Sequence, residues 1–168
     1  LIVAGAGSGK TKVLTSRIAN IIREKKAYPS QILSVTFTNK AASEMQYRVS
    51  KLLGSSAVGL SWLGTFHSIC AKLLRKHAQA ANLNSNFTII DSDDQIRLIK
   101  NICKAENIDI KHLSPRYVLA IIDRWKNRGF YPNEVIIDNK DIYEKNILPI
   151  YKIYQDKLLG LNSCDFGD

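Results

Sequence analysis

The 168-residue sequence lacks a long apolar run and a paired-cysteine pattern. No segment reaches the roughly 18 apolar residues that a membrane-spanning helix requires, and no charged segment followed by an apolar stretch indicates a signal peptide. Cys70, Cys103 and Cys164 are far apart and lack CxxC spacing, which disfavours a disulfide framework and a zinc site. These absences predict a soluble, cytoplasmic protein with no membrane partner.

Acidic residues are scarce in the first half of the chain. Residues 1–90 contain twelve Lys and Arg but only Glu24 and Glu44, whereas residues 91–168 contain twelve basic and thirteen acidic residues. The net charge of +9 therefore arises entirely before residue 91. This asymmetry fits a surface that binds nucleic-acid phosphates, and it also fits a basic surface that is merely solvated, so charge alone leaves both open.

Strand and helix patterns alternate over the first ninety residues. Apolar, β-branched runs predict four strands, at residues 1–4, 32–37, 58–63 and 87–90. Helical periodicity follows each of the first three runs, and Asn39 can cap the second of these helices. The alternation predicts an α/β fold with a parallel sheet flanked by helices.

From Asp91 onward the sequence predicts helix after helix. A capping-box pattern at residues 92–95 starts a helix through about residue 106, and Ser114-Pro115 starts another that stops near Gly129. Residues 141–160 form a third helical pattern, in which Pro149 predicts a kink or a break. Because strand periodicity and charge excess end together, we place a domain boundary between Ile90 and Asp91.

Residues 4–11, AGAGSGKT, have the pattern of a phosphate-binding loop. They follow a predicted strand and open a predicted helix, which is the context that such a loop requires. Small residues let successive backbone N–H groups turn toward phosphates, Lys10 supplies a cation for the γ-phosphate, and the Thr11 hydroxyl can bind Mg²⁺. The strict pattern has Gly where Ala4 stands. The alternative is a glycine-rich turn before an ordinary helix.

Two further segments place polar and aromatic residues directly after predicted strands. They are Phe37, Thr38, Asn39 and Lys40 after the second strand, and Thr65, Phe66 and His67 after the third. Such positions lie at the carboxyl edge of a parallel sheet, where ligands bind. Hydroxyls and amides suit phosphate oxygens, and rings suit unstacked bases, so a single-strand track is predicted. Buried core rings at Phe37 and Phe66 and a structural His67 are the alternatives.

With these three segments in order, the chain resembles the UvrD/PcrA/Rep family of superfamily 1 DNA helicases. AGAGSGKT resembles its motif I, VTFTNKAASEM its motif Ia, and GTFHSICAKLLR the motif that follows. The stretches IIDSDDQ, IDRWKN and YQDKLLGLNSCDFGD resemble the helical 1B-type insertion of the family and the return to its first RecA-like domain. The resemblance covers essentially the whole chain.

The resemblance implies a P-loop NTPase with a RecA-like parallel sheet flanked by helices and an inserted all-helical subdomain. Residues 1–90 would be the first part of the ATP-binding domain, residues 91–163 the insertion and residues 164–168 the return. The implied cofactors are ATP and Mg²⁺, with Lys10 and Thr11 as catalytic residues and Thr11 as the metal ligand. The implied cofactor-binding residues are Ala6, Gly7, Ser8, Gly9, Lys10, Thr11 and Lys12.

The same resemblance implies that single-stranded DNA contacts Phe37, Thr38, Asn39, Lys40, Thr65, Phe66 and His67. Lys126 and Asn127 would lie on the insertion near the duplex, whereas Trp125 belongs to an apolar stripe and is expected in the core. Three positions depart from the family pattern: Lys12 replaces an arginine that stacks on adenine, Gln46 replaces a basic residue, and Gly167 interrupts an acidic run.

The implied parent is an ATP-dependent DNA helicase of repair or replication that moves 3′ to 5′. Its partners would be single-stranded DNA, a junction of single and double strands, and a second RecA-like domain of the same parent chain. No DExxQ segment occurs in the sequence, so the chain reads as a fragment with little or no ATP hydrolysis by itself. The alternatives are a truncated, non-catalytic nucleotide- or DNA-binding module and a helicase subunit of a helicase–nuclease.

Overall fold

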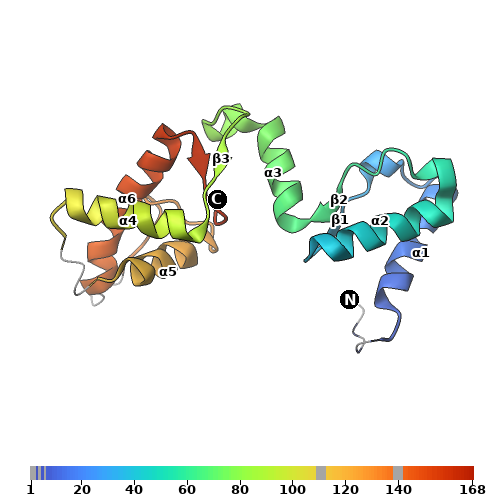
Figure 1. Ribbon diagram of the computed structural model, residues 1–168, viewed down its shortest axis with the longest axis horizontal. Coiled ribbons are helices and arrows are strands. Elements are labelled where there is room, and N and C mark those ends of the chain that lie inside the picture. The colour runs from blue at the N-terminus through green and yellow to red at the C-terminus, as the bar shows by residue number, and fades with distance from the viewer. Residues whose placement is uncertain (1–2, 4, 6, 109–112, 138–141) are drawn as a thin grey trace. The chain divides into compact units, whose positions relative to one another are not determined.

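The structure is a computed structural model that describes residues 3, 5, 7–108, 113–137 and 142–168 (Figure 1). It divides into two compact units, Leu1–Leu73 and Leu74–Asp168, with the boundary inside one helix. Each unit has its own buried core, so each is described by itself. The sequence-derived domain boundary at residue 90 concerns the RecA-like fold of the parent and stays a prediction.

The first unit contains two parallel strands and the helices around them. Its elements are α1 (Lys10–Arg23), η1 (Pro29–Gln31), β1 (Ser34–Thr36), α2 (Asn39–Leu53), η2 (Gly54–Ala57), β2 (Leu63–Thr65) and the start of α3 (Phe66–Lys76). β1 pairs with β2 in parallel, with Ser34 opposite Leu63 and Thr36 opposite Thr65. A parallel pair requires a crossover connection, and α2 supplies it.

A small core joins α1 to α2 in this unit. Ile18 of α1 packs with Met45 and Val49 of α2 and with Leu60. Met45 and Val49 are four residues apart and therefore face the same side of their helix. Near the ends of both helices, the Arg23 guanidinium donates a hydrogen bond to the Leu52 carbonyl. The second half of α1 is thereby fixed along α2.

The second unit is mostly helical and contains one short parallel strand pair. Its elements are η3 (Ala78–Ala81), β3 (Thr88–Ile89), α4 (Ser92–Ala105), α5 (Pro115–Lys126), α6 (Ile142–Gly160) and β4 (Ser163–Cys164). β3 and β4 pair with Thr88 opposite Ser163. The three helices therefore leave directly after one strand and return directly before its neighbour.

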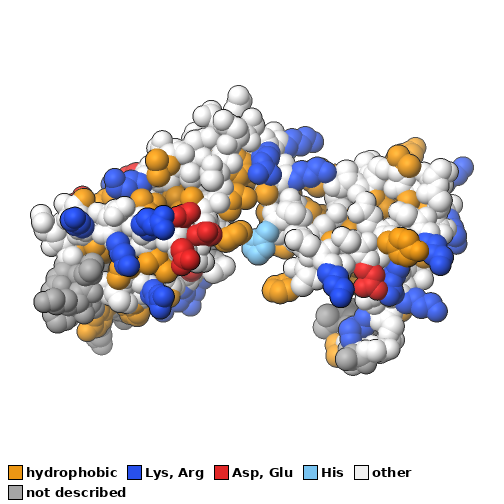
Figure 2. Space-filling model, in the orientation of Figure 1, with side chains coloured by type: hydrophobic (Ala, Val, Ile, Leu, Met, Phe, Trp, Pro, Cys, Tyr) orange, Lys and Arg blue, Asp and Glu red, His pale blue; other side chains and the backbone are white. Residues whose placement is uncertain are grey.

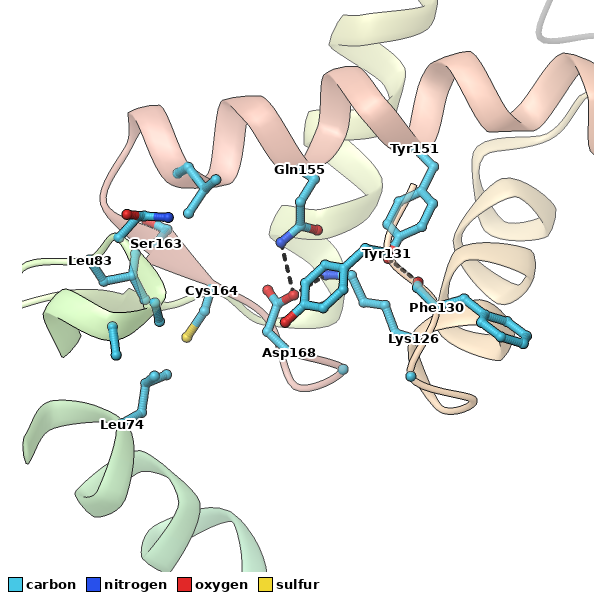
Figure 3. A pocket seen from close by; sticks show the side chains of 16 residues that line it. Leu74, Leu83, Lys126, Phe130, Tyr131, Tyr151, Gln155, Ser163, Cys164 and Asp168 are labelled. Atoms are coloured by element: carbon cyan, nitrogen blue, oxygen red, sulfur yellow. Dashed lines mark hydrogen bonds and ion pairs between the residues drawn. The ribbon is translucent and has the colours of Figure 1, made fainter. Parts of the chain in front are cut away.

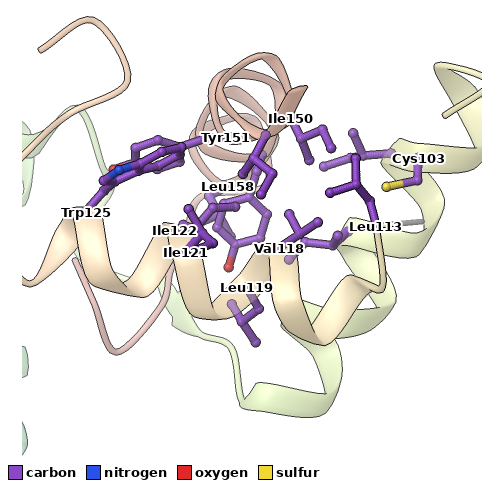
Figure 4. Close-up of a cluster of buried hydrophobic side chains, with 14 residues drawn as sticks. Cys103, Leu113, Val118, Leu119, Ile121, Ile122, Trp125, Ile150, Tyr151 and Leu158 are labelled. Atoms are coloured by element: carbon purple, nitrogen blue, oxygen red, sulfur yellow. The ribbon is translucent and has the colours of Figure 1, made fainter. Parts of the chain in front are cut away.

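The main core of the second unit lies between α4, α5 and α6 (Figure 4). Ile99, Ile102, Val118, Ile122, Ile150 and Leu158 are among its fully buried members. The side chains of two capping residues start two of these helices, α4 and α5. The Asp91 carboxylate accepts hydrogen bonds from the N–H groups of Asp93 and Asp94, and the Ser114 hydroxyl accepts one from Tyr117.

Several sequence-derived elements are corrected by the structure. The third strand is not at residues 58–63 but at Leu63–Thr65, because Gly59 has a left-handed φ of 100° that interrupts extension. Of the predicted strand at residues 1–4, only Val3 is described; it is 88% exposed and outside any strand, and the other three residues lie outside the described part. Pro149 does not break α6, which continues through it.

The structure is thus a mixed α/β chain with two small parallel sheets. Each sheet has two strands in the described residues, and a larger RecA-like sheet stays a prediction. Cys70, Cys103 and Cys164 are free thiols. None of the helices in the described part of the chain has the length and apolarity that a bilayer crossing needs.

Candidate functional site

The loop before α1 is built on two glycines that no other residue replaces without strain. Gly7 and Gly9 have φ angles of 76° and 84°, in the left-handed region. An added Cβ would meet no atom within 4 Å at either position, so conformation and not space requires glycine. The Ser8 N–H and hydroxyl both donate to the Gly5 carbonyl, at 3.4 and 2.7 Å, which closes the loop into a compact turn.

The start of α1 is arranged to bind an anion. Gly9 caps the helix without a side chain, and the first turn contains no acidic residue. The first regular backbone bond is from the Val13 N–H to the Gly9 carbonyl, so the N–H groups of Lys10, Thr11 and Lys12 precede the helical ladder. These groups and the helix dipole favour a phosphate at this end.

The two predicted catalytic residues occupy the first positions of this helix. The Lys10 ammonium donates to the Gly5 carbonyl across the loop, at 2.5 Å. This position keeps the charge over the turn, where phosphate oxygens can replace the carbonyl as acceptor. Thr11 and Lys12 are exposed at the same end, and Ser8 forms the turn. Ala6 lies outside the described residues.

The second group of predicted residues lies at one edge of the β1–β2 sheet. Because Thr36 is opposite Thr65 in a parallel pair, both strands end together. The segment starting at Phe37 therefore lies beside the segment starting at Phe66, and both continue into helices, α2 and α3. The pairing thus brings together two sequence segments separated by nearly thirty residues.

The aromatic rings at this edge are available to a ligand. Phe37 is 95% exposed and Phe66 is 63% exposed, so neither is a core ring. The Phe66 and His67 rings meet edge to face, with centroids 6.1 Å apart. Exposed rings of this kind are the groups on which unstacked bases stack.

The hydroxyls at the same edge have structural partners. The Thr38 hydroxyl accepts a hydrogen bond from the Ala41 N–H and caps α2, and the Thr65 hydroxyl accepts one from the Ser68 N–H. Thr65 is nearly buried, whereas Asn39 and Lys40 are exposed on the first turn of α2. Asn39 and Lys40 are therefore placed to reach phosphate oxygens, and the two threonines hold the backbone that presents them.

Basic side chains spread over the surface of the first unit. Residues 1–73 contain ten Lys and Arg against Glu24 and Glu44, and Figure 2 shows blue side chains around α1 and α2 with a single small red group. The Arg48 guanidinium is paired with Glu44. The remaining basic excess gives this unit the charge that a phosphate backbone attracts.

The predicted DNA contact by Lys126 is corrected by the structure. Its side chain is 3% exposed, and its ammonium is paired with Asp165 at 2.8 Å and Asp168 at 2.6 Å. It also lies 5.3 Å from the centre of the Tyr154 ring. An ammonium held between two carboxylates inside the unit supplies no cation to DNA. Asn127 is exposed, and its side-chain amide donates to the Asp123 carbonyl.

Asp165 is the centre of this buried group. Burial would raise the pKa of its carboxyl, but the adjacent Lys126 ammonium, together with hydrogen bonds from Lys126, Tyr154 and the Gly167 N–H, lowers the pKa below its ordinary value. Sequence reasoning missed this group because Lys126 and Asp165 are far apart in the chain. Trp125, in contrast, is core as expected, since it is 4% exposed and stacks on Tyr151.

Comparison with known proteins shows that the whole chain is similar to one protein family. Residues 1–168 match the family described as UvrD/REP helicase N-terminal domain. A "Probable DNA helicase II homolog" from Rickettsia conorii is 47% identical over 171 residues, which cover 100% of this chain and 26% of that protein. An "ATP-dependent DNA helicase PcrA" from Bacillus subtilis is 45% identical over 168 residues, covering 100% of this chain and 23% of that protein.

A protein with the same printed name from Staphylococcus epidermidis is also 45% identical over 168 residues, again covering 23% of its own length. The chain therefore spans about a quarter of the length of these relatives. The loop before α1 and the exposed rings at the strand edge are consistent with this match over residues 1–168. The chain belongs to the UvrD/REP helicase family and corresponds to its N-terminal domain.

Proposed function

We propose that this chain forms the nucleotide-binding part and a portion of the single-strand track of an ATP-dependent DNA helicase. The observation that carries the proposal is the loop before α1, in which Gly7 and Gly9 take left-handed backbone conformations at a helix start that has no side-chain cap. The exposed Phe37 and Phe66 rings support the DNA part. Relatives named as ATP-dependent DNA helicases support the activity.

In this proposal the chain binds ATP at the start of α1. Backbone N–H groups of the loop and of the first helical turn donate to the phosphates, and the Lys10 ammonium neutralises charge on the terminal phosphate. Thr11 is the residue that would hold Mg²⁺, through its hydroxyl. The ion, when bound, withdraws negative charge from the phosphates. Small residues and the absence of acids in the first turn make this end of α1 compatible with the bound group.

DNA binding in this proposal uses the edge of the β1–β2 sheet. Bases of an unpaired strand stack on Phe37 and Phe66, and Asn39 and Lys40 contact its phosphates. The partners would be single-stranded DNA, its junction with a duplex, and a second RecA-like domain of the parent protein. Movement of the parent from 3′ to 5′, in repair or replication, belongs to the proposal as well.

The nucleotide part is tested by a Lys10→Ala substitution. Hydrogen bonds to charged groups contribute about 1.5–3 kcal/mol, so the affinity for labelled ATP with Mg²⁺ is expected to fall at least about tenfold. Lys76→Ala, at the end of α3 and within the second unit, is the control and should leave the affinity unchanged. Equal affinities of wild type and Lys10→Ala contradict the loop assignment.

The helicase part is tested on the intact parent protein with a strand-displacement assay. We expect ATP-dependent unwinding of a duplex that carries a 3′ single-stranded tail, and its absence would refute the proposed activity. A second candidate is a binding module without catalysis, which the exposed Phe37 and Phe66 rings and the basic excess of residues 1–73 support equally well. Salt-dependent binding of single strands by the 168-residue chain, together with no ATP turnover by the intact protein, would establish that candidate.

A further inference from the structure

A cavity of about 450 Å³ lies within the Leu74–Asp168 unit (Figure 3). Its wall is apolar where Leu74, Leu83 and Leu159 line it, and polar where Gln155 and Asp168 line it. Tyr131 contributes an aromatic ring. The volume falls in the range of about 300–1,000 Å³ that is typical of small-molecule sites. None of the residues assigned to ATP or to the single strand lines this cavity.

Gln155 supplies a buried acceptor with a defined direction. Its amide nitrogen donates to the Asp168 carboxylate at 3.0 Å, as the dashed line in Figure 3 shows. The reverse orientation would put the amide oxygen against the carboxylate, so the hydrogen bond fixes which atom is which. The oxygen Oε1 is left buried without a partner in the described residues. Buried acceptors are almost always satisfied, so this oxygen can accept a hydrogen bond from a donor placed in the cavity.

The charges around the cavity favour a neutral ligand that donates hydrogen bonds. The Lys126 ammonium is shared by the Asp165 and Asp168 carboxylates. These two carboxylates and one ammonium give this side of the cavity an excess of negative charge. Because the ammonium is already paired with both carboxylates, it is not available to a ligand phosphate. A ligand whose inserted part is uncharged and carries an N–H group fits this environment.

The backbone that carries the Tyr131 ring is held in place although the residue is exposed. The Phe130 N–H donates to the Trp125 carbonyl, the Tyr151 hydroxyl donates to the Phe130 carbonyl at 3.0 Å, and the Tyr131 N–H donates to the Glu134 carboxylate. The Tyr131 residue itself is 63% exposed. Figure 3 draws it with Asp168 and Gln155 among the side chains that line the cavity. A ring carried on a fixed backbone can stack on a flat ligand with little loss of backbone freedom.

We propose that this cavity binds a nucleobase that carries an exocyclic amino group. The base stacks on Tyr131, contacts the apolar wall through its ring, and donates its amino hydrogen to Gln155 Oε1. The proposal rests on the proposed function, because a chain that handles ATP and unpaired DNA meets such bases both in free nucleotides and within a strand.

The test compares adenosine with purine riboside, which lacks only the amino group. Binding to the 168-residue chain is measured by titration calorimetry. We expect adenosine to bind about five- to tenfold more tightly, as for one neutral hydrogen bond. Gln155→Met removes the acceptor at similar side-chain length and should abolish the preference, and Tyr131→Leu should weaken both ligands.

Tyr143→Leu is the matched control, since Tyr143 is exposed in the same unit and outside the cavity. Fluorescence of the buried Trp125 checks that each variant keeps its fold. Equal binding of the two nucleosides by wild type overturns the proposal, and so does a preference that survives Gln155→Met with the fold intact.

Oligonucleotides identify the source of the base. Decamers of deoxyadenosine and of deoxypurine riboside are compared by fluorescence anisotropy, with the same variants. A preference for the adenine strand that disappears in Gln155→Met supports the cavity and assigns it to strand DNA. Nucleoside preference without strand preference supports the cavity with a free nucleoside as ligand. Failure of the cavity leaves ATP binding through Lys10 and strand binding through Phe37 intact, so it is distinct from failure of the proposed function.

Discussion

Gly167 is a position where one added carbon has a specific steric cost. A Cβ there would lie 2.8 Å from Lys126 Cδ and 3.2 Å from Lys126 Cβ, and this lysine stem is buried. Overpacking of this kind costs about 1–3 kcal/mol. We therefore expect Gly167→Ala to lower the free energy of unfolding of the second unit by that amount, measured by urea denaturation.

Gly160→Ala provides the matched control for this substitution. Its Cβ would meet no atom within 4 Å at the end of α6, and its φ is not in the left-handed region. Alanine at such a site stabilises by about 0.4–1 kcal/mol. A Gly167→Ala protein as stable as the Gly160→Ala protein would show that Lys126 moves aside without cost.

The buried Lys126–Asp165 pair predicts a defined response to pH. Removing one partner of a buried pair costs about 3–5 kcal/mol, so Lys126→Met should lose that much stability at pH 7. In the wild type the pKa of Asp165 is lowered in the folded state. Its contribution is therefore present above its unfolded pKa of about 3.9 and is lost as the pH falls through the lower folded value.

The sign reverses in the Lys126→Met variant. Without the ammonium, burial raises the pKa of Asp165, and a carboxyl with a raised folded pKa is stabilised at acid pH and loses that stabilisation as the pH rises through its unfolded value. The stability difference between the two proteins should therefore shrink between pH 7 and pH 4, as measured by urea unfolding at each pH. A constant difference would refute the pairing.

Individual residues were predictable where their role depends on local pattern. The apolar helical spacing around Trp125 identified a core ring, and the loop glycines were identified by their spacing before Lys10 and Thr11. Lys126 was misjudged because its partners, Asp165 and Asp168, come from a distant segment that no periodicity connects to α5. The sequence does not determine whether Phe37 and Phe66 are exposed, since an aromatic residue after a strand is compatible with both core and surface.

At the scale of elements, the β1–β2 edge predicts a stacking contribution from Phe37. Base stacking on an aromatic side chain contributes about 1–3 kcal/mol, so Phe37→Ala should weaken binding of a fluorescent oligothymidylate about 5- to 150-fold. Tyr47→Ala is the control, because Tyr47 is 68% exposed on α2 and away from the strand edge. Equal losses for the two variants would indicate a nonspecific effect, and no loss for Phe37→Ala would remove this ring from the track.

Helices were predicted more accurately than strands, for a physical reason. The hydrogen bonds and the apolar stripe of a helix involve residues close together in the chain. The apolar periodicity of α1, α2, α4 and α5 is therefore enough to predict these helices. Strand ends depend on pairing with distant segments, and β1 and β2 are limited to the three residues that pair. Gly59 shifted the third strand, and Pro149 was accommodated on an exposed face of α6.

At the scale of the whole molecule, the two units should respond separately to denaturant. The first unit has four buried side chains in its main cluster, whereas the larger cluster of the second unit has fourteen. Apolar burial is the main source of stability, so the first unit should unfold at the lower urea concentration. Trp62 reports on the first unit and Trp125 on the second, and Trp62→Phe and Trp125→Phe variants separate the two fluorescence signals.

Addition of ATP with Mg²⁺ tests this division further. A ligand that binds only the folded first unit stabilises it by about 2.7 kcal/mol at one hundred times its dissociation constant. The Trp62 transition should therefore move to higher urea by more than the Trp125 transition does. A single transition for both tryptophans, or equal shifts in both, would show that the units unfold together.

The pairing of β3 with β4 has a consequence for how the segment between these strands can evolve. Strands joined by backbone hydrogen bonds lie about 4.8 Å apart, so the helices between Thr88 and Ser163 begin and end at neighbouring points. Exchange, lengthening or loss of the intervening segment leaves the spacing of its two anchor points unchanged. The helical region can thus diverge in length and surface chemistry, like a replaceable cassette, while selection holds the flanking scaffold constant.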